Sequence, residues 1–187
     1  VYTKLTGEDG ADLSEEEILA YLDENGYVSA NHILIATMDL TTGEAYDDAT
    51  VAERAALAAQ IAGELQGIED LDEMLERFRE LKEEYDEDTG STEGYIFGDG
   101  VMMPAFYEGT LALEEYEVSD PVETSYGYHV ILRLPLKGDS LLFSVQGSPV
   151  TARRQMAQSD ITAKIDAFFT ANPASHAEGL ETLDLTQ

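Results

Sequence analysis

Two of the three histidines in this chain stand in alternating apolar runs, which is the pattern of a half-buried strand. His32 lies in the run 31–35, and His129 lies in the run 127–131. Two central strands could therefore present both imidazoles to one site. The segment 100–106 adds two methionines and a phenylalanine. Together these residues predict an imidazole pair that faces an apolar pocket.

Several kinds of chemistry are open to such a pair. With an ordinary pKa of about 6.5, either ring can act as a general base or, with Asp88 as a third donor, hold a metal ion for a hydrolase. The same rings can instead supply only fixed polarity beside an apolar slot. Taken one at a time, each histidine is also explained as a satisfied strand residue, and Met102 and Phe106 as core residues. The order of the motifs along the chain is needed to choose between these interpretations.

The elements that must position these residues follow from periodicity and from end signals. A capping box at Ser14 to Glu17 precedes a short helix that Gly26 ends. Asp70 gives a second capping signal, and Pro104 stands at a helix start. After the first helix the expected order is strand, helix, helix, strand, helix, strand, at residues 27–38, 49–65, 71–81, 95–97, 104–113 and 127–134.

In this order the motifs resemble those of parvulin-type peptidyl-prolyl isomerases, and within them the PrsA-like foldases of Gram-positive bacteria. The motifs are His32 to Leu34, Tyr85 to Asp88, Gly94 to Phe97, Gly100 to Phe106, Val118 to Thr124 and Tyr126 to His129. The resemblance implies an α+β, parvulin (FKBP-like) fold. Such a fold has a small, mainly antiparallel sheet surrounded by helices, here with flanking helical segments.

The resemblance also implies catalytic roles for four residues. His32 and His129 match the paired histidines at the parvulin centre, where a hydroxyl such as that of Thr124 can orient one ring. Asp88 matches the acid or cysteine of the catalytic region. A carboxylate there is expected to influence the substrate carbonyl and to bond to the histidine pair. Because it is not cysteine, covalent catalysis through a thiol is excluded at this position.

The implied substrate-binding residues are Met102, Met103, Phe106, Tyr126 and Tyr95. Met102 and Phe106 match the positions that form the floor of the proline slot, and Tyr126 is expected to complete the wall. Two positions depart from the family. Met103 replaces a frequent glutamine, so one hydrogen bond to the substrate is expected to be missing, and Gly94 falls where many relatives have leucine.

Rotation about a prolyl peptide bond has a barrier of roughly 18–20 kcal/mol, although the cis and trans forms differ by only about 1 kcal/mol. The resemblance implies a peptidyl-prolyl cis–trans isomerase that binds the twisted amide more tightly than the planar forms, with no metal or other cofactor. Its expected partners are unfolded or partly folded proline-containing polypeptides, whose folding it assists. The alternative is a holdase or peptide-binding module with little or no isomerase activity.

Charge excludes other partners. The chain has 39 acidic and 10 basic residues and a formal net charge of −29, which repels nucleic acid and anionic membrane surfaces. The loop 36–49 contains acidic residues and no basic ones, so phosphorylated or acidic substrates are expected to be disfavoured. A basic or neutral residue before proline is the expected preference.

Cysteine is absent, and no stretch approaches the roughly 20 apolar residues that span a bilayer, so we expect no direct membrane insertion in this segment. The start carries neither an initiator Met nor a signal peptide, which suggests a processed or excised piece. An extracytoplasmic location, secreted or anchored at the cell surface as a lipoprotein, is implied by the resemblance only.

The chain is expected to divide into three parts. Residues 1–26 form an N-terminal helical segment, residues 27–136 the isomerase domain, and residues 137–187 a connector and a C-terminal helix. Glycine and proline indicate the connector up to residue 149, and helical spacing follows over 151–172. The resemblance assigns the two flanking parts to a chaperone-like helical region that is present only in part.

Overall fold

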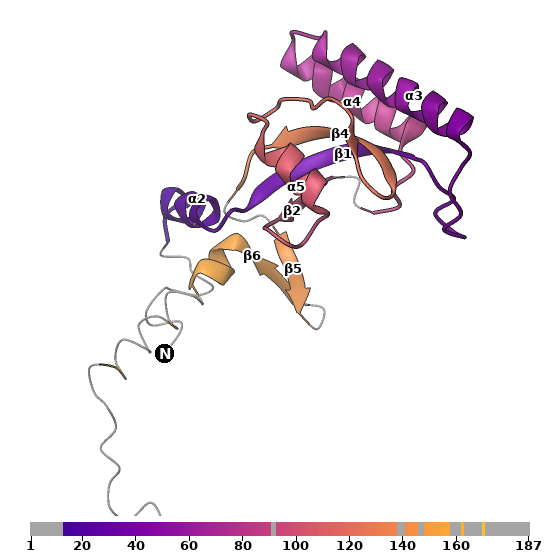
Figure 1. Ribbon diagram of the computed structural model, residues 1–187. Coiled ribbons are helices and arrows are strands. Elements are labelled where there is room, and N and C mark those ends of the chain that lie inside the picture. The colour runs from indigo at the N-terminus through magenta and orange to yellow at the C-terminus, as the bar shows by residue number, and fades with distance from the viewer. Residues whose placement is uncertain are drawn as a thin grey trace, which may run out of the picture.

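The computed structural model describes residues 13–90, 93–137, 141–145, 148–157, 162 and 170. A four-stranded antiparallel sheet forms the centre, with its strands in the spatial order β2-β1-β4-β3 (Figure 1). The strands are β1 (Val28–Ala36), β2 (Tyr95–Phe97), β3 (Val122–Glu123) and β4 (Gly127–Leu134). The predicted α+β class with a small antiparallel sheet is confirmed.

The central strand β1 is buried on both faces along its whole length. Because successive side chains of a strand point to opposite faces, its residues divide between two cores. Ile33 and Ile35 belong to a core that also contains residues of two long helices. Val28 and Ala30 belong to a second core on the other face.

The register between β1 and β4 places both histidines on that second face. His32 lies opposite Ile131, which belongs to the second core, and Leu34 lies opposite His129. The two histidines are therefore diagonal neighbours on adjacent strands. The expectation that two central strands present both imidazoles to one side of the sheet is confirmed.

Two long helices lie side by side across the first face (Figure 1). They are α3 (Asp48–Gln66) and α4 (Leu71–Tyr85). Both begin within one residue of the predicted starts, because an aspartate caps each of them. Asp47 accepts a 2.8 Å hydrogen bond from the N–H of Thr50, and Asp70 accepts one of 3.0 Å from the N–H of Glu73.

The short helix α5 (Pro104–Leu111) packs on the second face. Its far end is fixed by Arg133 of β4. Nη1 of Arg133 lies within hydrogen-bonding distance of three carbonyl oxygens, those of Thr110 (3.3 Å), Leu111 (3.2 Å) and Leu113 (2.8 Å). Carbonyls at a helix end have no partner inside the helix, so this guanidinium ties the helix that carries Phe106 to the strand that carries His129.

The helix α2 (Glu15–Glu24) begins at the predicted capping box, in which Ser14 and Glu17 bond to each other's backbone N–H groups. Its buried residues Ile18 and Leu22 pack against Ala152. Residues 152–157, 162 and 170 are helical, as predicted for 151–172, and the other residues of that predicted helix lie outside the described part of the chain.

Two strand elements of the structure were not predicted. Residues expected to form a connector form the hairpin of β5 (Leu141–Val145) and β6 (Ser148–Thr151), in which Pro149 pairs with Ser144. Proline is tolerated in an edge strand, and each strand of a two-stranded sheet is an edge. The second missed element, β3, has two residues, which is too short for alternation to reveal.

Candidate active site

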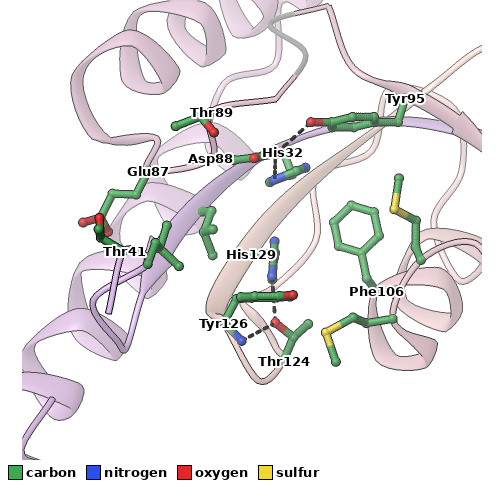
Figure 2. Close-up of a pocket in the computed structure, with 14 residues that line it drawn as sticks. His32, Thr41, Glu87, Asp88, Thr89, Tyr95, Phe106, Thr124, Tyr126 and His129 are labelled. Carbon is green, nitrogen blue, oxygen red and sulfur yellow. Dashed lines mark hydrogen bonds and ion pairs between the residues drawn. The ribbon is translucent and has the colours of Figure 1, made fainter. Parts of the chain in front are cut away.

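The structure brings all nine predicted site residues to one cleft of about 560 Å³ between β1, β4 and α5 (Figure 2). They are His32, Asp88, Tyr95, Met102, Met103, Phe106, Thr124, Tyr126 and His129. The cleft lies on the second face of the sheet. Residues far apart in the sequence meet here because the antiparallel pairing of β1 with β4 joins the two ends of the domain.

The two imidazoles form the centre of the cleft with one phenyl ring. His32 is 5% exposed and His129 is 7% exposed, and their ring centroids are 5.0 Å apart at an angle of 64°. Phe106 of α5 lies edge-on to both, at 5.1 Å from His32 and 5.2 Å from His129. Each ring therefore supports the other two, and their orientations are fixed by packing.

A tight turn between β3 and β4 holds the second imidazole. Oγ1 of Thr124 lies 2.9 Å from Nε2 of His129 (Figure 2). The same oxygen accepts a 3.2 Å hydrogen bond from the N–H of Tyr126. The turn is closed by the N–H of Thr124, which donates to the carbonyl of Gly127 at 2.8 Å. The hydroxyl is thus placed to orient one ring.

Asp88 follows α4 and, among the described contacts, touches the first imidazole and not the second. Its Oδ2 lies 3.2 Å from Nε2 of His32 and accepts a 2.9 Å hydrogen bond from the hydroxyl of Tyr95 (Figure 2). Its Oδ1 accepts a 3.0 Å bond from the N–H of Gly90. Burial raises the pKa of this carboxyl, but these bonds and His32 outweigh burial and hold the pKa below its ordinary value. The carboxylate is charged at neutral pH.

Both imidazoles are neutral at neutral pH. Burial lowers the pKa of His32, a shift that Asp86 and Asp88 oppose. Burial, together with His32, lowers the pKa of His129 to about 3. Among the described residues, Nδ1 of each ring and Nε2 of His32 have no hydrogen-bond partner, so the 3.2 Å approach of Asp88 is an electrostatic contact rather than an aligned hydrogen bond.

The apolar wall comes from the start of α5. Met102 and Met103 immediately precede the helix, and Phe106 stands in its first turn. Both methionines line the cleft and pack against the apolar cluster that contains Phe106. Phe106 also packs on Phe97 of β2, with centroids 5.6 Å apart. This wall contributes no charged group to the cleft.

Comparison with known proteins identifies the family. The family described as "Rotamase: PPIC-type PPIASE domain" matches residues 32–134, which begins at the first imidazole and ends with β4. The chain belongs to this rotamase family. The foldase protein PrsA of Halalkalibacterium halodurans is 33% identical over 132 residues, which cover 66% of this chain and 32% of that protein.

Two further matches lie in the same group of proteins. The foldase protein PrsA of Oceanobacillus iheyensis is 48% identical over 61 residues, 30% of this chain and 20% of its own. The crystal structure of PrsA from Bacillus subtilis aligns at 26% identity over 67% of this chain and 41% of that one, with a TM-score of 0.44. The chain thus spans about a third of the length of its first curated relative.

One departure from other parvulins has a structural reason. Gly94 adopts a φ of +96°, and a Cβ there would lie 2.6 Å from the carbonyl oxygen of Ala30. A leucine is therefore excluded at this position. The next residue supplies the wall in its place, because the ring of Tyr95 stacks on His32 with centroids 5.9 Å apart and an angle of 18°.

Five further residues line the cleft of this rotamase domain and were not predicted: Leu34, Leu40, Thr41, Glu87 and Thr89. Leu34 was open to prediction, because it stands two positions after His32 in a strand and so shares its face. Glu87 and Thr89 flank Asp88, whereas Leu40 and Thr41 come from a loop that gives no periodic signal. Among the described residues, no group of three or more histidine, cysteine or acidic side chains could hold a metal ion.

Proposed function

We propose that this chain accelerates the cis–trans isomerisation of Xaa-Pro bonds in unfolded or partly folded polypeptides and so assists their folding. The observation that carries the proposal is the pair of buried, neutral imidazoles packed against Phe106 in an open cleft. Neither a nucleophile nor a cofactor is required, because rotation about the bond makes and breaks no covalent bond.

The chemistry follows from the twisted amide. A planar amide is strongly polar through resonance, and resonance is lost as the bond rotates, so the barrier reaches roughly 18–20 kcal/mol. A cleft that replaces water by sulfur and aromatic rings solvates the planar amide poorly and the less polar twisted form comparatively well. The twisted form is then bound more tightly than either ground state, which is what lowers the barrier.

The proposed roles divide between the two sides of the cleft. Met102, Met103 and Phe106 form the floor for the pyrrolidine ring, and Tyr95 and Tyr126 form its walls. The catalytic group comprises His32, His129, Thr124 and Asp88. Its members hold a fixed polarity beside the carbonyl that turns, and they transfer no proton, because amide rotation abstracts none.

A matched pair of methionine variants tests this proposal. NMR exchange on Ala-Xaa-Pro-Phe peptides with the full chain should show acceleration, and Met102→Ala should lower kcat/KM about tenfold by removing part of the floor. Met156→Ala makes the same deletion beside Ile18, outside the cleft, and should leave the rate unchanged. Absence of any acceleration by the wild-type chain would overturn the proposal.

A holdase function is the second candidate. Leu40 and Tyr126 line the same cleft and are 44% and 50% exposed, so an extended apolar segment has surface to bind without being isomerised. Suppression of client aggregation by the wild-type chain, with no change in exchange rate for any proline peptide, would favour this function over the first.

The charge of the cleft supports a substrate preference. Glu87 and Asp88 line the cleft, and no lysine or arginine does so among the described residues. Arg54 pairs with Glu87 at 2.6 Å, which leaves Asp88 as the less compensated charge. An acidic or phosphorylated residue before proline is therefore disfavoured, and Lys-Pro peptides should exceed Glu-Pro peptides in kcat/KM at low salt. Equal values would contradict this preference.

Location and domain division are also proposals. By similarity to PrsA foldases we place the protein outside the cytoplasm, and we assign residues 27–136 to the isomerase domain and 1–26 and 137–187 to a helical region. The packing of α2 on Ala152 supports a common region built from both flanks. None of the described helices combines the length and apolarity needed to cross a membrane.

A further inference from the structure

A buried ion pair lies at the end of α4, next to the cleft. Lys82 stands in the last turn of the helix and Asp86 is its C-terminal cap, so the two side chains meet one turn apart. They are only 9% and 6% exposed, and Nζ of Lys82 bonds directly to Oδ2 of Asp86. Stability alone does not explain why these two charges are buried, because the free-energy cost of desolvating both commonly exceeds the gain from their attraction.

The remaining bonds of this pair go to the backbone of the site. Nζ of Lys82 donates to the carbonyl oxygen of His32 at 2.7 Å. Oδ1 of Asp86 accepts from the N–H of Leu34 at 2.8 Å and from the N–H of Asp88 at 3.2 Å. One ion pair thus binds the backbone of both His32 and Asp88, whose side chains meet in the cleft.

These bonds stand in for a strand neighbour that β1 lacks. β2 pairs with β1 only over Val28–Ala30, so no strand in the described part of the chain pairs with the same edge of β1 further along. The N–H of Glu87 donates to the carbonyl of Leu34 at 3.0 Å, and Oε2 of Glu87 accepts from the N–H of Ala36 at 2.7 Å. The segment that leads to Asp88 is therefore fastened along β1, next to His32.

We propose that Lys82 and Asp86 are positioning residues, which set the 3.2 Å contact between His32 and Asp88. The inference rests on the proposed isomerase function. An apolar pair of similar volume could fill the same space, but it would leave the peptide groups of residues 32, 34 and 88 without these partners. The backbone that carries Asp88 would then be free to move away from the ring.

Lys82 and Asp86 also act on His32 electrostatically, and their effects are opposite in sign. Asp86 raises the pKa of His32 and Lys82 lowers it, so the two act against each other on a ring whose burial already lowers its pKa. Removing only one of them leaves an uncompensated charge beside the imidazole. Removing both restores charge balance and still abolishes the bonds to the backbone, which separates the electrostatic effect from the positioning effect.

The test uses three variants and a matched control. Lys82→Met removes one charge, Asp86→Leu removes the other charge together with its hydrogen-bond acceptors, and the double variant removes the whole pair. The control is Arg77→Gln in the same helix, where Arg77 pairs with Glu64 at 2.6 Å and Glu80 at 2.7 Å on the surface, away from the cleft. All rates are measured at a temperature where circular dichroism shows each variant to be folded.

The first measurement is the division between kcat and KM. We expect each of the three variants to lower kcat at least about fivefold, with KM changed less than about twofold, because the cleft keeps its walls. Arg77→Gln should change neither. A purely structural pair would lower the melting temperature and leave the kcat of the folded protein unchanged, and that result for the double variant would overturn the proposal.

The second measurement does not depend on activity. Asp88→Asn should shift the NMR titration of His32 in the wild-type background, because the carboxylate lies near the ring. In the double variant the same change should shift that titration much less, because ring and carboxylate have separated. An equal shift in both backgrounds would overturn the proposal. If the wild-type chain shows no isomerase activity, the proposed function fails. The titration still tests whether Lys82 and Asp86 hold Asp88 next to His32.

Discussion

The hydroxyl of Tyr95 donates a 2.9 Å hydrogen bond to the carboxylate oxygen of Asp88 that faces His32. The ring of the same tyrosine stacks on the imidazole. One side chain is therefore both a wall of the cleft and a partner of its acid. The two roles can be separated, because the hydroxyl makes the hydrogen bond and the ring makes the wall.

Tyr95→Phe should lower kcat and leave KM unchanged. Loss of the hydroxyl removes a bond that holds the pKa of Asp88 low and fixes its carboxylate, whereas the ring stays in place. One hydrogen bond is worth about 0.5–1.5 kcal/mol net, so kcat should fall about two- to twelvefold. NMR exchange on an Xaa-Pro peptide measures both constants. Tyr116→Phe, outside the cleft, is the control, and equal kcat in the two variants would contradict the prediction.

Gly90→Ala should act through the same hydroxyl. A Cβ at this position would lie 1.7 Å from the hydroxyl oxygen of Tyr95, so the tyrosine must move away from Asp88. We expect a fall of about fivefold in kcat/KM in the wild-type background and less than about twofold in the Tyr95→Phe background. A double-mutant cycle measures the difference, and strict additivity of the two changes would argue against it.

The stability of the domain should fall on acidification through His129. Its pKa is about 3 in the folded state and about 6.5 when exposed, so between these values the unfolded chain binds more protons. The contribution is fully present above pH 6.5 or so and is lost as the pH falls toward 3, by up to about 1.4 kcal/mol per pH unit.

Urea unfolding at a series of pH values checks this expectation. His129→Asn lacks the titrating ring, so its free energy of unfolding should depend less steeply on pH than that of the wild-type chain. Other groups, including the many carboxylates, titrate in both proteins, and the difference between the two curves isolates the imidazole. Parallel curves would show that the ring stays accessible to protons in the folded state.

Met103→Gln should tighten substrate binding. Met103 lines the cleft at a position where parvulins often carry glutamine. Its sulfur accepts a 3.4 Å hydrogen bond from Oγ of Ser125. An amide there can donate to the backbone of a bound peptide, and we expect KM to fall about two- to fivefold. Met103→Leu, which keeps the volume and adds no donor, should leave KM unchanged; a similar fall in both variants would point to shape alone.

Much of the site follows from sequence because its residues lie on elements with strong periodic signals. His32 and His129 stand in alternating strands, and Phe106 follows a proline that starts a helix, so their common location could be predicted. The burial of Lys82 was not predicted: the residue lies four positions after Phe78, on the buried face of α4, but lysine is a residue type that is rarely buried. Its burial depends on Asp86 and on a strand edge fifty residues away.

The wall made by Tyr95 shows a second limit of sequence reasoning. The sequence shows glycine at position 94, where many relatives have leucine, but only the backbone shows that Gly94 has no room for a side chain beside Ala30. Asp88 was expected to bond to both histidines and its described contacts reach His32 alone. Such details depend on distances across the cleft, which no local pattern records.

The contact of α2 with Ala152 means that the polypeptide leaves one helical cluster before β1 and returns to it after β6. The two residue groups that flank this segment, α2 before it and Ala152 after it, are therefore in contact. Domains whose ends lie close together commonly tolerate excision or insertion, so we expect that this segment can be replaced by a short turn, or inserted into a loop of another protein, with the packing of α2 on Ala152 kept.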